Sequence, residues 1–105
     1  MITVRFDRRQ GSLQSVEVTG HAGYARHGQD VVCASVTSAV QLVCNGITEV
    51  LGVSARVAVE ENLIRLVLPQ DSPKAAVDFL QALSLHLVLL EQDYPDYLQT
   101  TVTEV

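Results

Sequence analysis

The chain has 105 residues, of which 48% are hydrophobic and 18% charged, and its formal net charge is −5 at pH 7. This length and composition argue against disorder and predict one domain, residues 1–105, with a core that needs neither disulfides nor a structural metal. The acidic balance argues against a nucleic-acid partner, since such binding relies on Lys and Arg, and it suits either a basic partner or simple solubility. No apolar run is uninterrupted enough to predict a membrane span, so we expect no membrane partner.

The chain begins with alternating apolar and polar residues, as in a half-buried strand and unlike a signal peptide. Residues 2–8 and 13–19 both alternate in this way, and Gln10-Gly11-Ser12 between them is typical of a turn. We therefore expect these two strands to form a hairpin.

Residues 20–30 break every period and contain three glycines, which predicts a loop of the kind that often carries chemistry. A helix is predicted over 31–51, with Asp30 as its N-cap and Gly52 at its end. One apolar stripe at steps of three and four residues runs along it: Val32, Val36, Val40, Val43, Ile47 and Leu51.

A second hairpin is predicted from residues 55–60 and 63–68, with Glu61-Asn62 as its turn. A second helix follows up to Glu91, with Ser72 as its cap and Pro73 as its first residue. That helix is apolar on nearly every face, which indicates that it is sandwiched or covered by a second subunit.

The order of elements is therefore ββαββα, with a possible final strand over residues 97–104. Antiparallel hairpins with two helices on one face predict a two-layer α+β domain. Its sheet would be mainly antiparallel, with about four to five strands.

Cys33 is the first residue that could carry chemistry. If Asp30 caps the helix, Cys33 lies in its first turn, where the helix dipole and free N–H groups favour a thiolate. The carboxylate of Asp30 has the opposite effect on an anion. A free cysteine is also commonly a small buried hydrophobe, and position alone leaves both interpretations open.

His21 opens the glycine-rich loop and could fold back over Cys33, giving the cysteine–histidine pair that an activated sulfur nucleophile requires. It could equally be a surface histidine, as could His27. Thr37 lies one turn after Cys33, where its hydroxyl could bond the sulfur, hold His21 or bond a backbone carbonyl. No paired spacing supports a metal site made of His21, His27 and Cys33, so we expect no metal or cofactor.

The two cysteines, Cys33 and Cys44, fall in one predicted helix, roughly 16 Å apart along its axis. A disulfide needs Cα atoms within about 7 Å, so none is expected between them. Two free thiols predict a reducing, cytoplasmic location. Cys44 is expected to be inert core.

The segment over residues 20–37, GHAGYARHGQDVVCASVT, resembles the signature of the ribosomal-processing cysteine protease family. In that signature a Gly-His-Ala start is followed by Gly-x-Asp-[Ile/Val]-Val-Cys-Ala. The element order and the segment Tyr94-Pro95-Asp96-Tyr97 are also similar, so the resemblance covers nearly the whole chain.

The resemblance implies a role for each matching position. Cys33 would be the nucleophile and His21 the group that takes its proton. Asp30 would cap the helix or orient His21, and Gly20 would let the loop hinge over substrate. Thr37 stands where the family usually has serine, so the hydroxyl is kept and a methyl group is added.

The resemblance also implies a homodimer that removes the N-terminal extension of a large-subunit ribosomal protein, number twenty-seven of the bacterial set. A basic ribosomal substrate suits an acidic enzyme, and a homodimer suits the apolar second helix. The alternative is a non-catalytic ribosome-associated binding module that uses the same loop as a docking surface. A thiol redox protein is less well supported, because no resolving cysteine is near Cys33 in sequence.

Overall fold

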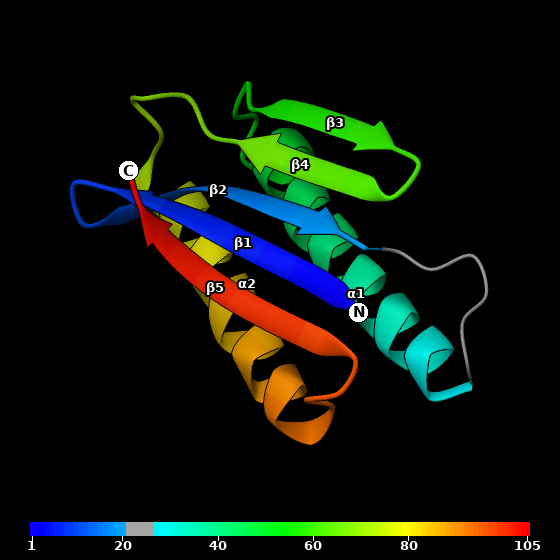
Figure 1. Cartoon of the computed structure of the whole chain (residues 1–105). Helices are drawn as coiled ribbons and strands as arrows, with labels where there is room; N and C mark the ends of the chain where they lie inside the picture. The colour runs from blue at the N-terminus through cyan, green and yellow to red at the C-terminus, as the bar shows by residue number, and fades with distance from the viewer. Residues whose placement is uncertain (21–26) are drawn as a thin grey trace.

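The protein's structure is a computed structural model that describes residues 1–20 and 27–105, with the backbone alone for residues 27–30. Five strands form one sheet in the order β3-β4-β2-β1-β5, and two long helices cover one of its faces (Figure 1). The predicted two-layer α+β architecture is therefore confirmed.

The first hairpin joins β1 (Ile2–Arg9) to β2 (Ser12–Thr19). The strands pair antiparallel, with Val4 opposite Val18. The turn has positive φ at both central residues, 52° at Gln10 and 80° at Gly11. Such turns match the natural twist of two strands, which explains why a sequence with glycine here forms a tight hairpin.

The second hairpin joins β3 (Arg56–Glu60) to β4 (Leu63–Val67), and β4 also pairs antiparallel with β2. This arrangement leaves β3 at one edge of the sheet. The last strand, β5 (Leu98–Glu104), pairs parallel with β1 and forms the other edge. The predicted final strand is confirmed, and the sheet is antiparallel except for this pair.

The two faces of the sheet differ as the alternating strands predict. The face toward the helices is apolar and fully covered at Val4, Phe6 and Leu66. The opposite face carries a charged cluster in which Glu17 accepts hydrogen bonds from Arg65 and lies 3.6 Å from the guanidinium of Arg5. One face therefore supplies the core, while the other meets solvent.

The helix α1 (His27–Asn45) continues without a break into a π-helical turn, η1 (Gly46–Val50). The predicted apolar stripe faces the sheet, with Val32, Val36, Val40 and Ile47 almost fully buried. By length and composition alone, the segment Val31–Val50 could also cross a membrane, contrary to the sequence-based expectation. The core helix of a folded domain can pass the same test, and the buried stripe of this segment packs into the hydrophobic core.

Two predicted helix starts are wrong. The helix α1 begins at His27, so Asp30 is its fourth residue and not its N-cap, and Cys33 lies in the second turn. A single glycine such as Gly28 costs a helix only about 1 kcal/mol and does not stop it. The second helix, α2 (Lys74–Asp93), begins after Pro73, and the hydroxyl of Ser72 donates to the Pro69 carbonyl instead of capping it.

Candidate active site

A cavity of about 380 Å³ lies between α1 and the β3–β4 hairpin. The helix contributes Cys33, Thr37 and Gln41 at successive turns along one side. The remaining lining residues come from the ends of β1 and β2 and from the hairpin and the helix: Ile2, Val18, Val36, Val59, Glu60, Glu61, Asn62, Leu63 and Ile64. The sheet edge and the helix thus form the two walls of one pocket.

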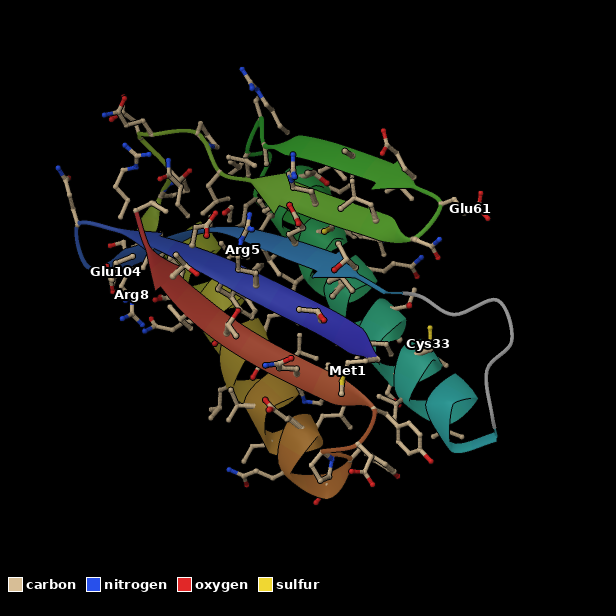
Figure 2. The ribbon with its side chains drawn as sticks, viewed as in Figure 1. Met1, Arg5, Arg8, Cys33, Glu61 and Glu104 are labelled. Atoms are coloured by element: carbon tan, nitrogen blue, oxygen red, sulfur yellow. The ribbon has the colours of Figure 1, made fainter. Side chains whose placement is uncertain are left out.

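Cys33 is partly buried and packs against the hydrophobic core while also lining this pocket. Figure 2 shows Cys33 on α1 and Glu61 at the tip of the β3–β4 hairpin, both at the same end of the molecule. A sulfur in this position is supported by packing on one side and open to a ligand on the other.

The pocket exists because α1 does not cover the edge of the sheet. Val57 and Val59 of β3 pair with Leu66 and Ile64 of β4, so they belong to the helix-facing side of the sheet. Leu66 is fully buried, yet Val57 is 44% exposed and Val59 is 73% exposed. An apolar strip of the inner face is therefore accessible from solvent, and Val59 of this strip lines the same pocket as Cys33.

The residues predicted to form the site are described to different extents. Cys33 and Thr37 line the same pocket, as their spacing along one helix face requires. His21 lies outside the described residues, and of Asp30 only the helical backbone is described. The predicted contact between His21 and Cys33 stays a prediction.

Gly20 ends the described segment that leads into the loop with His21. Its φ of +84° is a conformation that other residues rarely adopt. A Cβ atom here would lie 2.2 Å from the carbonyl oxygen of Met1, far inside van der Waals contact with backbone. Any side chain would have to displace either the start of β1 or the end of β2, so the geometry requires glycine.

The second cysteine, Cys44, differs from Cys33 in its surroundings. Both are free thiols, so the expected lack of a disulfide between them agrees with the structure. Cys44 packs against the core and is not among the residues lining the pocket, and burial raises the pKa of its thiol. Its environment fits the predicted role as core.

Sequence reasoning missed the contribution of the β3–β4 turn. Glu60, Glu61 and Asn62 were assigned only to strand and turn, yet they form the rim of the pocket opposite Cys33. Nothing local in the sequence indicates this shared pocket, because residues 33 and 61 come to it from distant parts of the chain through the packing of α1 and the hairpin.

Comparison with known proteins identifies the family of this chain. The family model described as "Cysteine protease Prp" matches residues 1–99. The chain belongs to the Prp family of cysteine proteases. The ribosomal processing cysteine protease Prp of Bacillus subtilis is 32% identical over 106 residues, covering 94% of this chain and 93% of that protein.

Solved structures share the Prp fold over their whole length. A crystal structure of SMU.848 from Streptococcus mutans has a TM-score of 0.90 at 24% identity, covering 100% of this chain and 99% of that one. The essential ribosomal processing protease Prp from S. aureus, in complex with a substrate peptide, has a TM-score of 0.90 at 20% identity, covering 98% and 100%. As a Prp family member, the chain is a cysteine protease.

Proposed function

We propose that this protease removes the N-terminal extension of large-subunit ribosomal protein number twenty-seven, with Cys33 as nucleophile and His21 as its general base. The observation that carries the proposal is that the Cys33 side chain lines a pocket beside an exposed apolar strip of the sheet. The names of the relatives support ribosomal processing, and the likeness of residues 20–37 to the family signature supports the two roles.

The proposed reaction has two halves. The thiol proton of Cys33 passes to His21, and the sulfur attacks the carbonyl carbon of the scissile peptide bond. His21 then gives the proton to the leaving amine, which departs and leaves the acyl group on sulfur. Water attacks this thioester while His21 takes one of its protons, the carbon–sulfur bond breaks to release the acid product, and His21 returns the proton to the sulfur.

The other predicted residues would support this pair. Gly20 would set the direction in which the chain enters the loop carrying His21, because its φ of +84° turns the backbone in a way that residues with a side chain rarely adopt. Asp30 would orient His21 from the first turn of α1. Thr37 would offer its hydroxyl to the sulfur or to the substrate from the same pocket wall.

Because α1 starts at His27, the turn that holds Cys33 lacks the free N–H groups that could stabilise an oxyanion. The unpaired N–H groups of a helix belong to its first turn, whereas Cys33 lies in the second. The effect of the helix dipole also falls off within the first turn. The proposal therefore assigns no oxyanion donor to the turn of α1 that holds Cys33.

The proposal is tested by incubating the protein with the extended ribosomal protein and mapping new N-termini by mass spectrometry. We expect one cut, which Cys33→Ser abolishes and the control Cys44→Ser leaves intact. Full cleavage by Cys33→Ser would refute the role of this sulfur. Loss of cleavage in His21→Ala, with folding unchanged by circular dichroism, is the expected result for the base.

We further propose that the enzyme is a homodimer in the cytoplasm. Two free thiols support a reducing compartment. Support for a second copy comes from a groove between the two helices, lined in part by Leu42, Ala82 and His86. Leu42 is 73% exposed, and Leu85 and Leu89 on α2 are 63% and 51% exposed. Large apolar side chains exposed on both helices are what an interface with a second copy would cover.

A further inference from the structure

We infer that Glu60 and Glu61 select substrates with a Lys or Arg beside an apolar residue near the cleaved bond. The inference rests on the proposed function, because it takes the Cys33 pocket as the place where substrate binds. It concerns specificity and gives these two carboxylates no part in the chemical steps.

The backbone positions of the two glutamates are set by the hairpin. Glu60 is the last residue of β3, and Glu61-Asn62 forms a two-residue turn in which Asn62 has a φ of 67°. Tight turns of this type have little conformational freedom. Both glutamates are exposed and both line the pocket that holds Cys33.

The charge at this rim is of one sign. Among the described residues that line the pocket, Glu60 and Glu61 are the charged ones, and none is Lys or Arg. On the same hairpin, Arg65 donates hydrogen bonds to Glu17 on the opposite face of the sheet. A ligand in the pocket therefore meets two negative charges that favour a cationic side chain.

The rest of the pocket is apolar. Val18, Val59 and Ile64 line it from the inner face of the sheet, and Val59 is 73% exposed. Val59 and Glu60 both line this pocket, so it presents an apolar surface together with the acidic rim. An extended peptide would place one apolar side chain on this surface and a neighbouring basic side chain at the turn.

The size of the expected effect follows from exposure. An exposed ion pair changes an equilibrium by about two- to fivefold, and charge at a rim acts mainly on the rate of encounter and on discrimination. We therefore expect a preference for basic residues of about fivefold. It should appear as a lower KM with kcat little changed, and added salt should weaken it.

The test is cleavage of a peptide library prepared by digesting a bacterial proteome, with cut sites mapped by mass spectrometry. Wild-type protein is compared with Glu60→Gln, Glu61→Gln and the double variant. Glu49→Gln is the matched control, since Glu49 is an exposed acid on η1 that does not line the pocket. We expect Lys and Arg to be enriched near the cut for wild type and control, and not for the double variant.

A pair of synthetic peptides then separates binding from chemistry. One is a sequence cut in the library, and the other has its basic residue replaced by Gln. The wild type should show the KM difference at low salt, and the double variant should not.

Three outcomes are distinct. Equal enrichment in wild type and the double variant, with Cys33-dependent cleavage, would overturn the role of Glu60 and Glu61 while leaving the proposed function intact. Cleavage that persists in Cys33→Ala, or no cleavage of any substrate, would overturn both. If the double variant loses the preference for basic residues while the wild type and Glu49→Gln keep it, the role of Glu60 and Glu61 in substrate selection is established.

Discussion

At Cys33 the environment differs from that of the other thiol of α1. Cys33 lines an open pocket, whereas Cys44 lies further along the helix, and burial raises the pKa of its thiol. A thiol must ionise before it reacts, so the two side chains should differ in reactivity even though they share one helix.

This difference predicts the order of modification by a thiol reagent. At pH 7.5, an iodoacetamide probe should label Cys44 more slowly than a free model thiol, because a raised pKa leaves less thiolate at that pH. Cys33 should label faster than Cys44, as measured by peptide mass spectrometry over time.

The single variants Cys33→Ala and Cys44→Ala assign each rate to one thiol. If Cys33 reacted no faster than Cys44, the proposed role of Cys33 as the activated nucleophile would be contradicted. Raising the pH should speed the labelling of Cys44, because more of the thiol ionises.

Gly20 gives a second prediction at the scale of one residue. Gly20→Ala should destabilise the fold by about 1–3 kcal/mol, since it combines a positive φ with a clash against the Met1 carbonyl. The free energy of unfolding in urea measures this cost. Cleavage by the folded variant should also fall, because the chain enters the His21 loop in a changed direction.

The matched control for that prediction is Gly11→Ala. Gly11 has a similar φ of +80°, but a Cβ atom there meets nothing within 4 Å. Its substitution should cost about 1 kcal/mol from backbone strain alone. Equal losses of stability at Gly11 and Gly20 would show that the contact with Met1 is unimportant.

Among the elements, β4 shows how one strand serves both faces of the sheet. Leu66 is fully buried under the helices, and its neighbour Arg65 bonds Glu17 on the solvent face. Residue alternation along a strand is what places them on opposite sides.

We therefore predict opposite sensitivities for these neighbours. Leu66→Ala should lower the free energy of unfolding by about 2–5 kcal/mol, because it leaves a cavity in the core. Arg65→Ala should cost under about 1 kcal/mol, because the ion pair it removes is exposed. Thermal or urea unfolding of the two variants checks this, and similar losses would contradict the assignment of faces.

The elements were also the part of the fold that the sequence predicted best. Strict alternation predicted β1 and β2, and the stripe through Val36 and Val40 predicted the face of α1. The parallel pairing of β5 with β1 was not predicted, since its orientation depends on how α2 crosses the sheet. The start of α1 was misplaced because a suitable cap residue, Asp30, is not by itself a cap.

The candidate site was predicted less completely than the elements, because part of it depends on how distant elements pack together. Cys33 and Thr37 share a pocket because helical spacing fixes their relation. The acidic rim at Glu60 and Glu61 comes from a distant hairpin, which only tertiary packing brings to the helix.

For the molecule as a whole, the proposed homodimer has a direct test. The double variant Leu42→Glu, Leu85→Glu should turn a dimer into a monomer, because it buries two charges in an apolar contact. Light scattering coupled to size exclusion measures the mass. Gln70→Glu, at an exposed loop position outside this surface, is the control and should stay dimeric. A monomeric wild type at micromolar concentration would contradict the proposed dimer.

The position of the N-terminus, against Gly20 and beside the pocket, has a practical consequence for handling the enzyme. Ile2 lines the pocket, so a fusion partner attached before Met1 would emerge beside Cys33. Val105 lies at the opposite end of β1, where its N–H donates to the Arg8 carbonyl at 2.9 Å (Figure 1). Purification tags and fluorophores therefore belong at the carboxyl end, where they leave the mouth of the pocket unobstructed.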